Sequence, residues 1–144
     1  MNAIYSDTKE LAISEIYAFK GYSIFMRHDH IIQLQFEEDG FYGDLDDAKN
    51  MMDTFRKLNN GTRHALMVIY QENNMFSKEV REYIAKKDIS DEILLADALV
   101  IKGLALKILG NAYLKINKPT RPTALFTNQE DALKWLKKII PATY

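Results

Sequence analysis

Side chains that could perform acid–base, nucleophilic or metal chemistry are present, but they do not form a recognisable set. His28 and His30 lie in one predicted turn, and two imidazoles are too few for a closed zinc site. His64 stands alone beside a predicted strand, with no evident serine or cysteine partner in the sequence. We therefore predict no catalytic residue, no metal site and no cofactor.

An acidic cluster precedes and opens one predicted helix. Its spacing does not match a calcium-binding loop, which alternates oxygen ligands and ends in a glutamate. Asp44 is the expected helix cap, and Asp46 and Asp47 fall in the first turn, where negative charge interacts favourably with the helix dipole. The other members belong to a solvated loop. The cluster consists of Glu37, Glu38, Asp39, Asp44, Asp46 and Asp47.

Ser77 has two interpretations. It is placed to cap a helix over residues 78–85, and serine is favoured at that position. Phosphorylation there would add negative charge at the positive end of the helix, so Ser77 is also a weak candidate phosphorylation site.

The most informative stretch runs from residue 98 to residue 129, because it contains no acidic residue and five basic ones. Within it, residues 104–116 predict a helix whose polar stripe is Lys107, Asn111 and Lys115, with apolar residues around the rest. Such a helix either lies in a core layer with its lysines in solvent, or buries against a second copy, another protein or an anionic amphiphile. The candidate ligand or partner surface is Lys107, Asn111, Tyr113, Lys115, Lys118 and Arg121.

Hydrophobic periodicity predicts the elements that position these residues. Residues 22–27 and 32–36 read as a hairpin, the second strand alternating apolar with polar as in a half-buried strand. Strands are also predicted at residues 65–70, 98–101 and 123–126, and residues 11–20 as a further strand. Helices begin after Asp44, after Ser77, at residue 104 and after Thr127, which has capping-box spacing to Glu130. Residues 86–97 read as a helical turn or irregular connector.

Bulk properties set the class of protein. The 144 residues suit a single domain spanning 1–144, with 1–10 loosely ordered. A net charge of -1 gives no reason to expect nucleic acid as a partner. No cysteine, signal peptide or membrane-length apolar run is present, so we expect a soluble, cytoplasmic protein without a membrane span.

With this layout, the sequence resembles a family of small bacterial proteins of unknown function with a SpoIIAA-like, or STAS-like, fold. The resemblance implies an α/β domain: a mixed sheet with an N-terminal hairpin followed by alternating helices and strands. It supplies no catalytic residue. Ser77 occupies a place similar to the phosphorylated serine of STAS-type antagonists, but the Asp-Ser-x-Gly setting is absent. The segments that carry the resemblance are residues 26–29, 45–49, 77–81, 110–119, 125–127 and 132–136.

Three functions follow as hypotheses. The first is a non-enzymatic protein-interaction or regulatory module, with the helix over residues 104–116 as a candidate homodimer interface. The second is a carrier of a small apolar or amphipathic anion held between that helix and the sheet, with Lys107, Lys115 or Arg121 near its head group. An enzyme ranks last, because no set of acid, base and nucleophile can be assembled.

Overall fold

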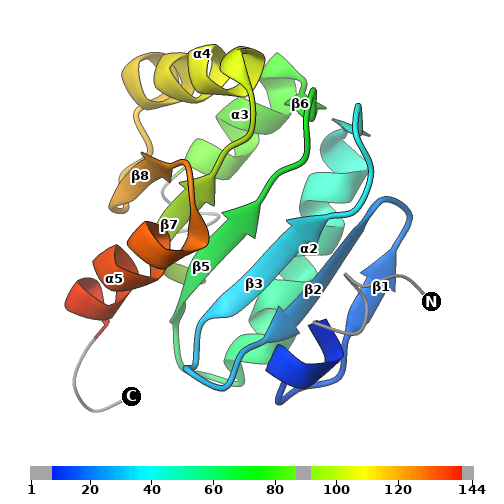
Figure 1. The fold of residues 1–144 in the computed structure, drawn as a ribbon, viewed down its shortest axis with the longest axis vertical. Helices are drawn as coiled ribbons and strands as arrows, with labels where there is room; N and C mark the ends of the chain where they lie inside the picture. Colours follow the sequence, from blue (N-terminus) through cyan, green and yellow to red (C-terminus); the bar gives the residue numbers. More distant parts are fainter. Residues whose placement is uncertain (1–7, 87–91, 141–144) are drawn as a thin grey trace.

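The structure, a computed structural model, describes residues 8–86 and 92–140. Its main sheet has six strands in the order β1–β2–β3–β5–β7–β8, and β4 and β6 form a separate two-stranded sheet (Figure 1). The strands β1, β2 and β3 are antiparallel, whereas β3, β5, β7 and β8 run parallel. Their bounds are β1 Tyr17–Phe19, β2 Tyr22–Met26, β3 Ile32–Phe36, β4 Tyr42–Gly43, β5 His64–Ile69, β6 Met75–Phe76, β7 Leu94–Val100 and β8 Thr123–Phe126.

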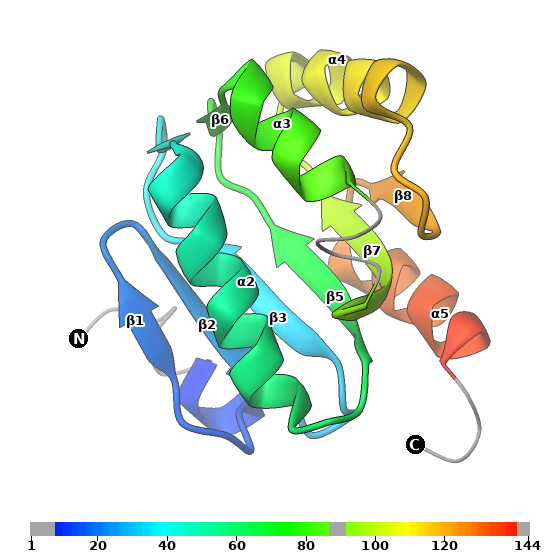
Figure 2. The same cartoon turned by 180° about the vertical axis from the view of Figure 1, so that it is seen from behind.

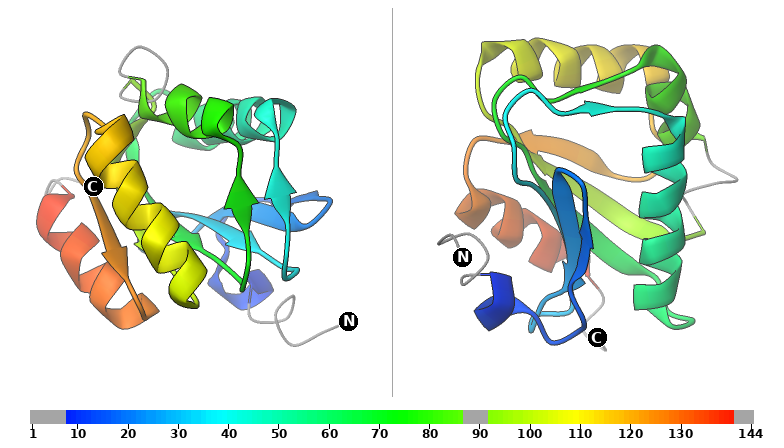
Figure 3. Two further views of the ribbon diagram at one scale, coloured as in Figure 1. Left: turned by 90° about the horizontal axis from the view of Figure 1, so that it is seen from above. Right: turned by 90° about the vertical axis from the view of Figure 1, so that its right-hand side faces the viewer.

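Helices α2 and α3 cover one face of the sheet, α5 covers the other, and α4 lies across one end (Figures 2 and 3). The predicted mixed α/β fold, with an N-terminal hairpin, three helix–strand pairs and a closing helix, is confirmed. The bounds are α2 Leu45–Asn59, α3 Lys78–Ala85, α4 Leu104–Ala112, a π-helical turn η2 Tyr113–Asn117, and α5 Gln129–Ile139.

Strand register builds the larger core. Paired positions on five adjacent strands carry one apolar residue each, so a continuous apolar row crosses one face of the sheet: Ile24, Leu34, Val68, Leu99 and Leu125. Met52 and Phe55 of α2 and Leu106 of α4 join the same core. On the opposite face, small residues of β5 and β7 pack with Ala132 and Leu136 of α5, because alanines allow a helix to approach the sheet closely.

The polar residues of β3 are not solvated, which corrects the prediction of a half-buried strand. Gln33 and Gln35 are both buried. A chain of hydrogen bonds satisfies them: Arg27 Nη1 donates to Gln33 Oε1 (2.7 Å), Gln33 Nε2 to Gln35 Oε1 (2.8 Å), and Gln35 Nε2 to Thr8 Oγ1 (2.7 Å). Arg27 also binds Asp29 through two nitrogens, which ties the turn after β2 to the sheet. Burial is tolerated because buried amides are hydrogen-bonded.

The N-terminal predictions are confirmed in part. Residues 8–11 form a helical turn and Thr8 is buried, so the predicted loose terminus is wrong for residues 8–10, while residues 1–7 lie outside the described part of the chain. The predicted strand over residues 11–20 is reduced to β1, Tyr17–Phe19, which pairs with β2.

The helix-capping signals are mostly confirmed. Asp44 and Asp47 form a reciprocal capping box at the start of α2, and Asn60 ends that helix in the left-handed conformation. Ser77 caps α3 by accepting a hydrogen bond from the amide of Val80 (3.1 Å). The predicted box at Thr127 is wrong, because Asn128 is the N-cap of α5 and accepts from the amide of Asp131.

The predicted connector over residues 86–97 is wrong at its C-terminal end. Strand β7 begins at Leu94, so Asp97 is a strand residue between β5 and β8. Residues 87–91 of that predicted connector lie outside the described residues. Pairing with β5 on one side and β8 on the other, where Asp97 lies opposite Leu66 and Thr123, extends the strand through an acidic position that local pattern alone reads as a break.

Candidate docking surface and internal cavity

Helix α4 lies at the end of the molecule where the parallel strands finish (Figure 1). Strands β3, β5, β7 and β8 are added in one direction, so their order does not reverse to open a crevice of the kind that binds nucleotides in doubly wound sheets. Gly110 allows α4 to approach β8 closely, since a Cβ atom at this position would stand 3.0 Å from the Leu125 methyl groups.

The outer side of α4 is apolar and exposed. Leu104 is 72% exposed, Ile108 62% and Ile116 76%, whereas Leu106 is buried against the sheet. The sequence indicates a helix that is apolar on two sides. In the structure, one of these sides packs into the core and the other faces solvent. The alternative in which this helix lies in a core layer with only its lysine stripe in solvent is wrong, because these three apolar side chains are exposed as well.

The π-helical turn η2 keeps this exposed row together. The exposed row repeats every fourth residue, at positions 104, 108, 112 and 116. An α-helix has 3.6 residues per turn, so side chains spaced by four residues rotate progressively around its axis. The wider turn at Tyr113–Asn117 offsets the drift, because a π-helical turn contains more residues. We define the α4 row as Leu104, Ile108, Ala112 and Ile116.

The structure divides the six residues of the predicted surface into two groups. Lys107, Asn111, Lys115 and Lys118 are exposed on α4, η2 and the residue after it. Tyr113 and Arg121 are buried and do not belong to an outer surface. The predicted surface is therefore four residues beside the α4 row, while the other two reach the interior.

Arg121 forms a buried ion pair. Its Nε donates to Oδ2 of Asp97 at 2.9 Å, its Nη2 donates to the same oxygen, and its Nη1 donates to the carbonyl oxygen of Ile84 at 3.1 Å. The exposed fraction of each side chain is only 4% for Arg121 and 6% for Asp97. The pair joins β7, the end of α3 and the segment before β8. Its positive charge is consequently neutralised inside the protein.

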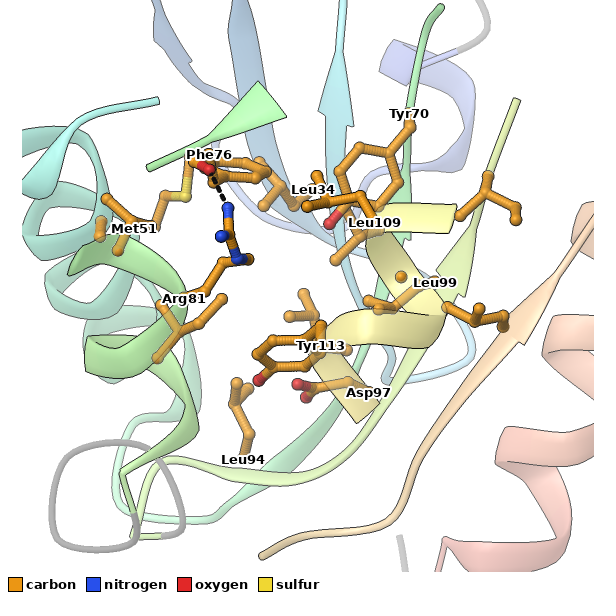
Figure 4. A pocket seen from close by; sticks show the side chains of 18 of the residues that line it. Leu34, Met51, Tyr70, Phe76, Arg81, Leu94, Asp97, Leu99, Leu109 and Tyr113 are labelled. Atoms are coloured by element: carbon orange, nitrogen blue, oxygen red, sulfur yellow. Dashed lines mark hydrogen bonds between the residues drawn. The ribbon is translucent and has the colours of Figure 1, made fainter. Parts of the chain in front are cut away.

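A cavity of about 90 Å³ lies between α4 and the sheet (Figure 4). Its walls are almost entirely apolar and come from α2, α3, α4, the η2 turn and five strands, β3, β5, β6, β7 and β8. Its polar lining consists of Tyr70, Arg81, Asp97, Tyr113 and Arg121. The apolar lining includes Leu34, Met51, Phe55, Val68, Val80, Leu94, Leu99, Leu106, Leu109 and Leu125.

The surroundings of Tyr70 inside the cavity favour its neutral form. Burial raises the pKa of Tyr70 far above its usual value, and the neighbouring Tyr113 and Asp97 raise it further. Arg81 extends from the first turn of α3 toward Phe76, and its Nη1 donates to the carbonyl oxygen of that residue (Figure 4). Asp97 and Arg81 are therefore the charged groups at this site that sequence reasoning missed.

One feature of the sequence could have identified Asp97 as a residue of the site. It is an acid directly before an apolar run, and the next acidic residue along the chain is Glu130. An isolated acid in a buried strand requires a basic partner, and Arg121 is one of the five basic residues in that interval. For Arg81 the sequence carries no comparable signal, since a basic residue on an amphipathic helix is ordinarily solvated.

The remaining candidate residues have structural roles. His28 and His30 lie in the turn before β3, and among the described residues no three histidines or carboxylates are close enough to hold a metal ion. His64 contacts Asn59 Oδ1 through Nδ1 at 3.1 Å, and burial lowers its pKa, with a further lowering from His30. Within residues 8–86 and 92–140, no helix is long and apolar enough to cross a membrane.

A family model describes this chain. Residues 24–140 match the domain of unknown function DUF7793. The chain belongs to the DUF7793 family. No curated protein matches it.

Solved structures relate the DUF7793 chain to a known fold. It is similar to an uncharacterised protein of the DUF3478 family with a SpoIIAA-like fold from Shewanella loihica PV-4, at 11% identity and a TM-score of 0.54, covering 87% of this chain and 98% of that one. A protein of unknown function from Arthrobacter sp. FB24 has 23% identity and a TM-score of 0.30, with 85% and 96% covered. The predicted SpoIIAA-like fold is confirmed, but the family is DUF7793.

Proposed function

We propose that this DUF7793 domain is a non-enzymatic interaction or regulatory module that docks a second copy of itself on the α4 row. The observation that carries the proposal is the exposure of Leu104, Ile108 and Ile116 along α4 and the η2 turn that continues it. Contiguous exposed apolar side chains with a polar border are characteristic of protein interfaces. The bacterial, cytoplasmic setting expected from the sequence belongs to the same proposal.

The α4 row is suited to a copy of itself. In an antiparallel, two-fold arrangement centred near residue 110, Leu104 lies opposite Ile116 of the partner, and Ile108 lies opposite the small Ala112. Ile108 then has room over a small residue, and Leu104 and Ile116 cover each other at the two ends of the contact. An isologous contact of this kind closes after two copies.

Charge distribution supports the same occupant. Lys107 and Lys115 border the α4 row, and the acidic start of α2, with exposed Asp44 and Asp46, lies at the same end of the molecule (Figure 1). A second copy laid on this end can bring its acidic side near these lysines. Such rim charges guide the orientation of docking more than they add affinity.

Sedimentation velocity over a wide range of protein concentration tests the proposal. We expect a concentration-dependent monomer–dimer equilibrium whose dissociation constant changes little with salt, because apolar contacts supply the affinity and salt screens only the rim charges. A monomer at every concentration would refute the second copy as the occupant of α4. Dimers that persist when Ile108 is replaced would place the interface elsewhere.

The cavity supports a second candidate function, the carrier. It lies where the sequence hypothesis placed a ligand, between α4 and the sheet. Its 90 Å³ is below the roughly 300–1,000 Å³ of pockets that hold drug-sized ligands, so the candidate ligand is small. Native mass spectrometry of untagged protein tests this function: retained mass that is lost on denaturation supports a carrier.

A further inference from the structure

We propose that the cavity under α4 selects a small neutral ligand bearing a hydroxyl group, with Asp97 Oδ1 as the acceptor. This inference rests on the carrier candidate and changes its ligand class, because an anion was expected from the basic residues of the sequence. The proposed preference for a neutral hydroxyl group follows from the charges and orientation of the Asp97–Arg121 pair and not from the size of the cavity.

Asp97 is positioned by the sheet to face the cavity. It lies on β7 two residues before Leu99, and side chains two apart on a strand point to the same face. Leu99 belongs to the apolar row on that face. Figure 4 shows the carboxylate directed toward Tyr113 and into the cavity.

The two oxygens of this carboxylate differ. Oδ2 accepts two hydrogen bonds from Arg121, whereas Oδ1 is buried and accepts none from any residue that the structure describes. A buried acceptor is costly to leave unmatched, so a donor from a bound molecule is strongly favoured there. The walls around it are apolar and fit a short hydrocarbon group.

The cavity does not favour an anion. Arg121 is already neutralised by Asp97, and a carboxylate placed beside Oδ1 would meet like charge in a poorly solvated space. Lys107 and Lys115 are exposed on the outer part of the helix, away from the interior. Arg81 is the one remaining basic group in the lining, and it donates to the Phe76 carbonyl oxygen.

A titration with three small probes tests the inference. 1-Butanol and diethyl ether contain the same atoms, but only butanol donates a hydrogen bond, and butyrate carries a negative charge. Binding is followed by NMR of labelled leucine methyl groups, with Leu106 and Leu109 inside the cavity and Leu11 as a remote control. We expect butanol to bind about tenfold more tightly than ether, and butyrate to bind most weakly.

Two variants separate the role of Asp97 in ligand binding from its role in folding. Asp97→Asn leaves the Arg121 guanidinium buried without its counter-ion and can prevent folding. The double variant Asp97→Leu with Arg121→Met removes both charges, and apolar replacement of a whole buried pair is often neutral for stability. In this folded double variant we expect butanol to lose its advantage over ether.

The outcomes are distinguishable. If none of the three probes binds, the carrier candidate and this inference both fail. Equal binding of butanol and ether refutes the inference and leaves a carrier without hydroxyl selection. Preferential binding of butyrate, lost in Arg81→Gln but retained in the double variant, overturns the inference and assigns an anion to Arg81.

Discussion

Replacement of Ile108 with lysine tests the α4 row directly. Full burial of a leucine or isoleucine side chain is worth about 1.5–3 kcal/mol. The exposed parts of Leu104, Ile108 and Ile116, taken on both protomers, are therefore worth about 6–13 kcal/mol on dimerisation. Association itself costs about 4–15 kcal/mol, which is of the same size as this gain, so we expect a weak and reversible dimer.

Ile108 contributes a definite share of that energy. Its 62% exposure on each of two protomers corresponds to about 2–4 kcal/mol. Loss of this amount weakens the dimer about thirtyfold or more. The added lysine also lies beside Lys107, which increases the positive charge at the interface. Sedimentation velocity should show Ile108→Lys as a monomer at concentrations where the unmodified chain is dimeric.

Ile13→Lys is the matched control, because Ile13 is also exposed but lies near the N-terminus, away from α4. Both substitutions replace a solvent-facing side chain, so each should change the free energy of unfolding by about 0.5 kcal/mol or less. An unchanged dimer in Ile108→Lys, or equal weakening by Ile13→Lys, would contradict the assignment of α4 as the interface.

Three further predictions concern the stability of the fold. Asp44→Ala removes the cap that accepts from the Asp47 amide, and we expect a loss of about 1 kcal/mol in urea unfolding; an unchanged midpoint would show that the cap is dispensable. Arg121→Met leaves Asp97 buried and charged, so thermal unfolding should reveal a loss of about 3–5 kcal/mol, and a mild effect would mean that water reaches the carboxylate. Because burial lowers the pKa of His64, folding favours its neutral form: stability is fully present above about pH 6.5 and falls as the pH drops through the lowered pKa. His64→Gln should reduce this pH dependence, and an identical dependence in the variant would assign it to another group.

Much of the fold is determined locally and was accessible from the sequence. Asp44 and Ser77 cap helices because their side-chain oxygens accept from amides three residues ahead, which needs no distant partner. The apolar run over residues 98–101 predicts a strand covered on both faces, and β7 is an interior strand that pairs with β5 and β8. Local signals failed where a nearby competitor existed, as when Asn128 rather than Thr127 capped α5.

Tertiary structure decided what the sequence left open. A helix that is apolar on two sides can be a buried core helix or a docking helix, and only its place across the end of the sheet exposes Leu104 and Ile108. In the sequence, the positive charge of Arg121 indicates an anion site. In the fold, β7 places Asp97 2.9 Å from Arg121, and the carboxylate neutralises that charge. Sequence by itself determined the α/β class and the order of elements, because propensity, capping and periodicity act over a few residues. Exposure and charge pairing depend on residues far apart in the chain, and so only the folded structure fixed them.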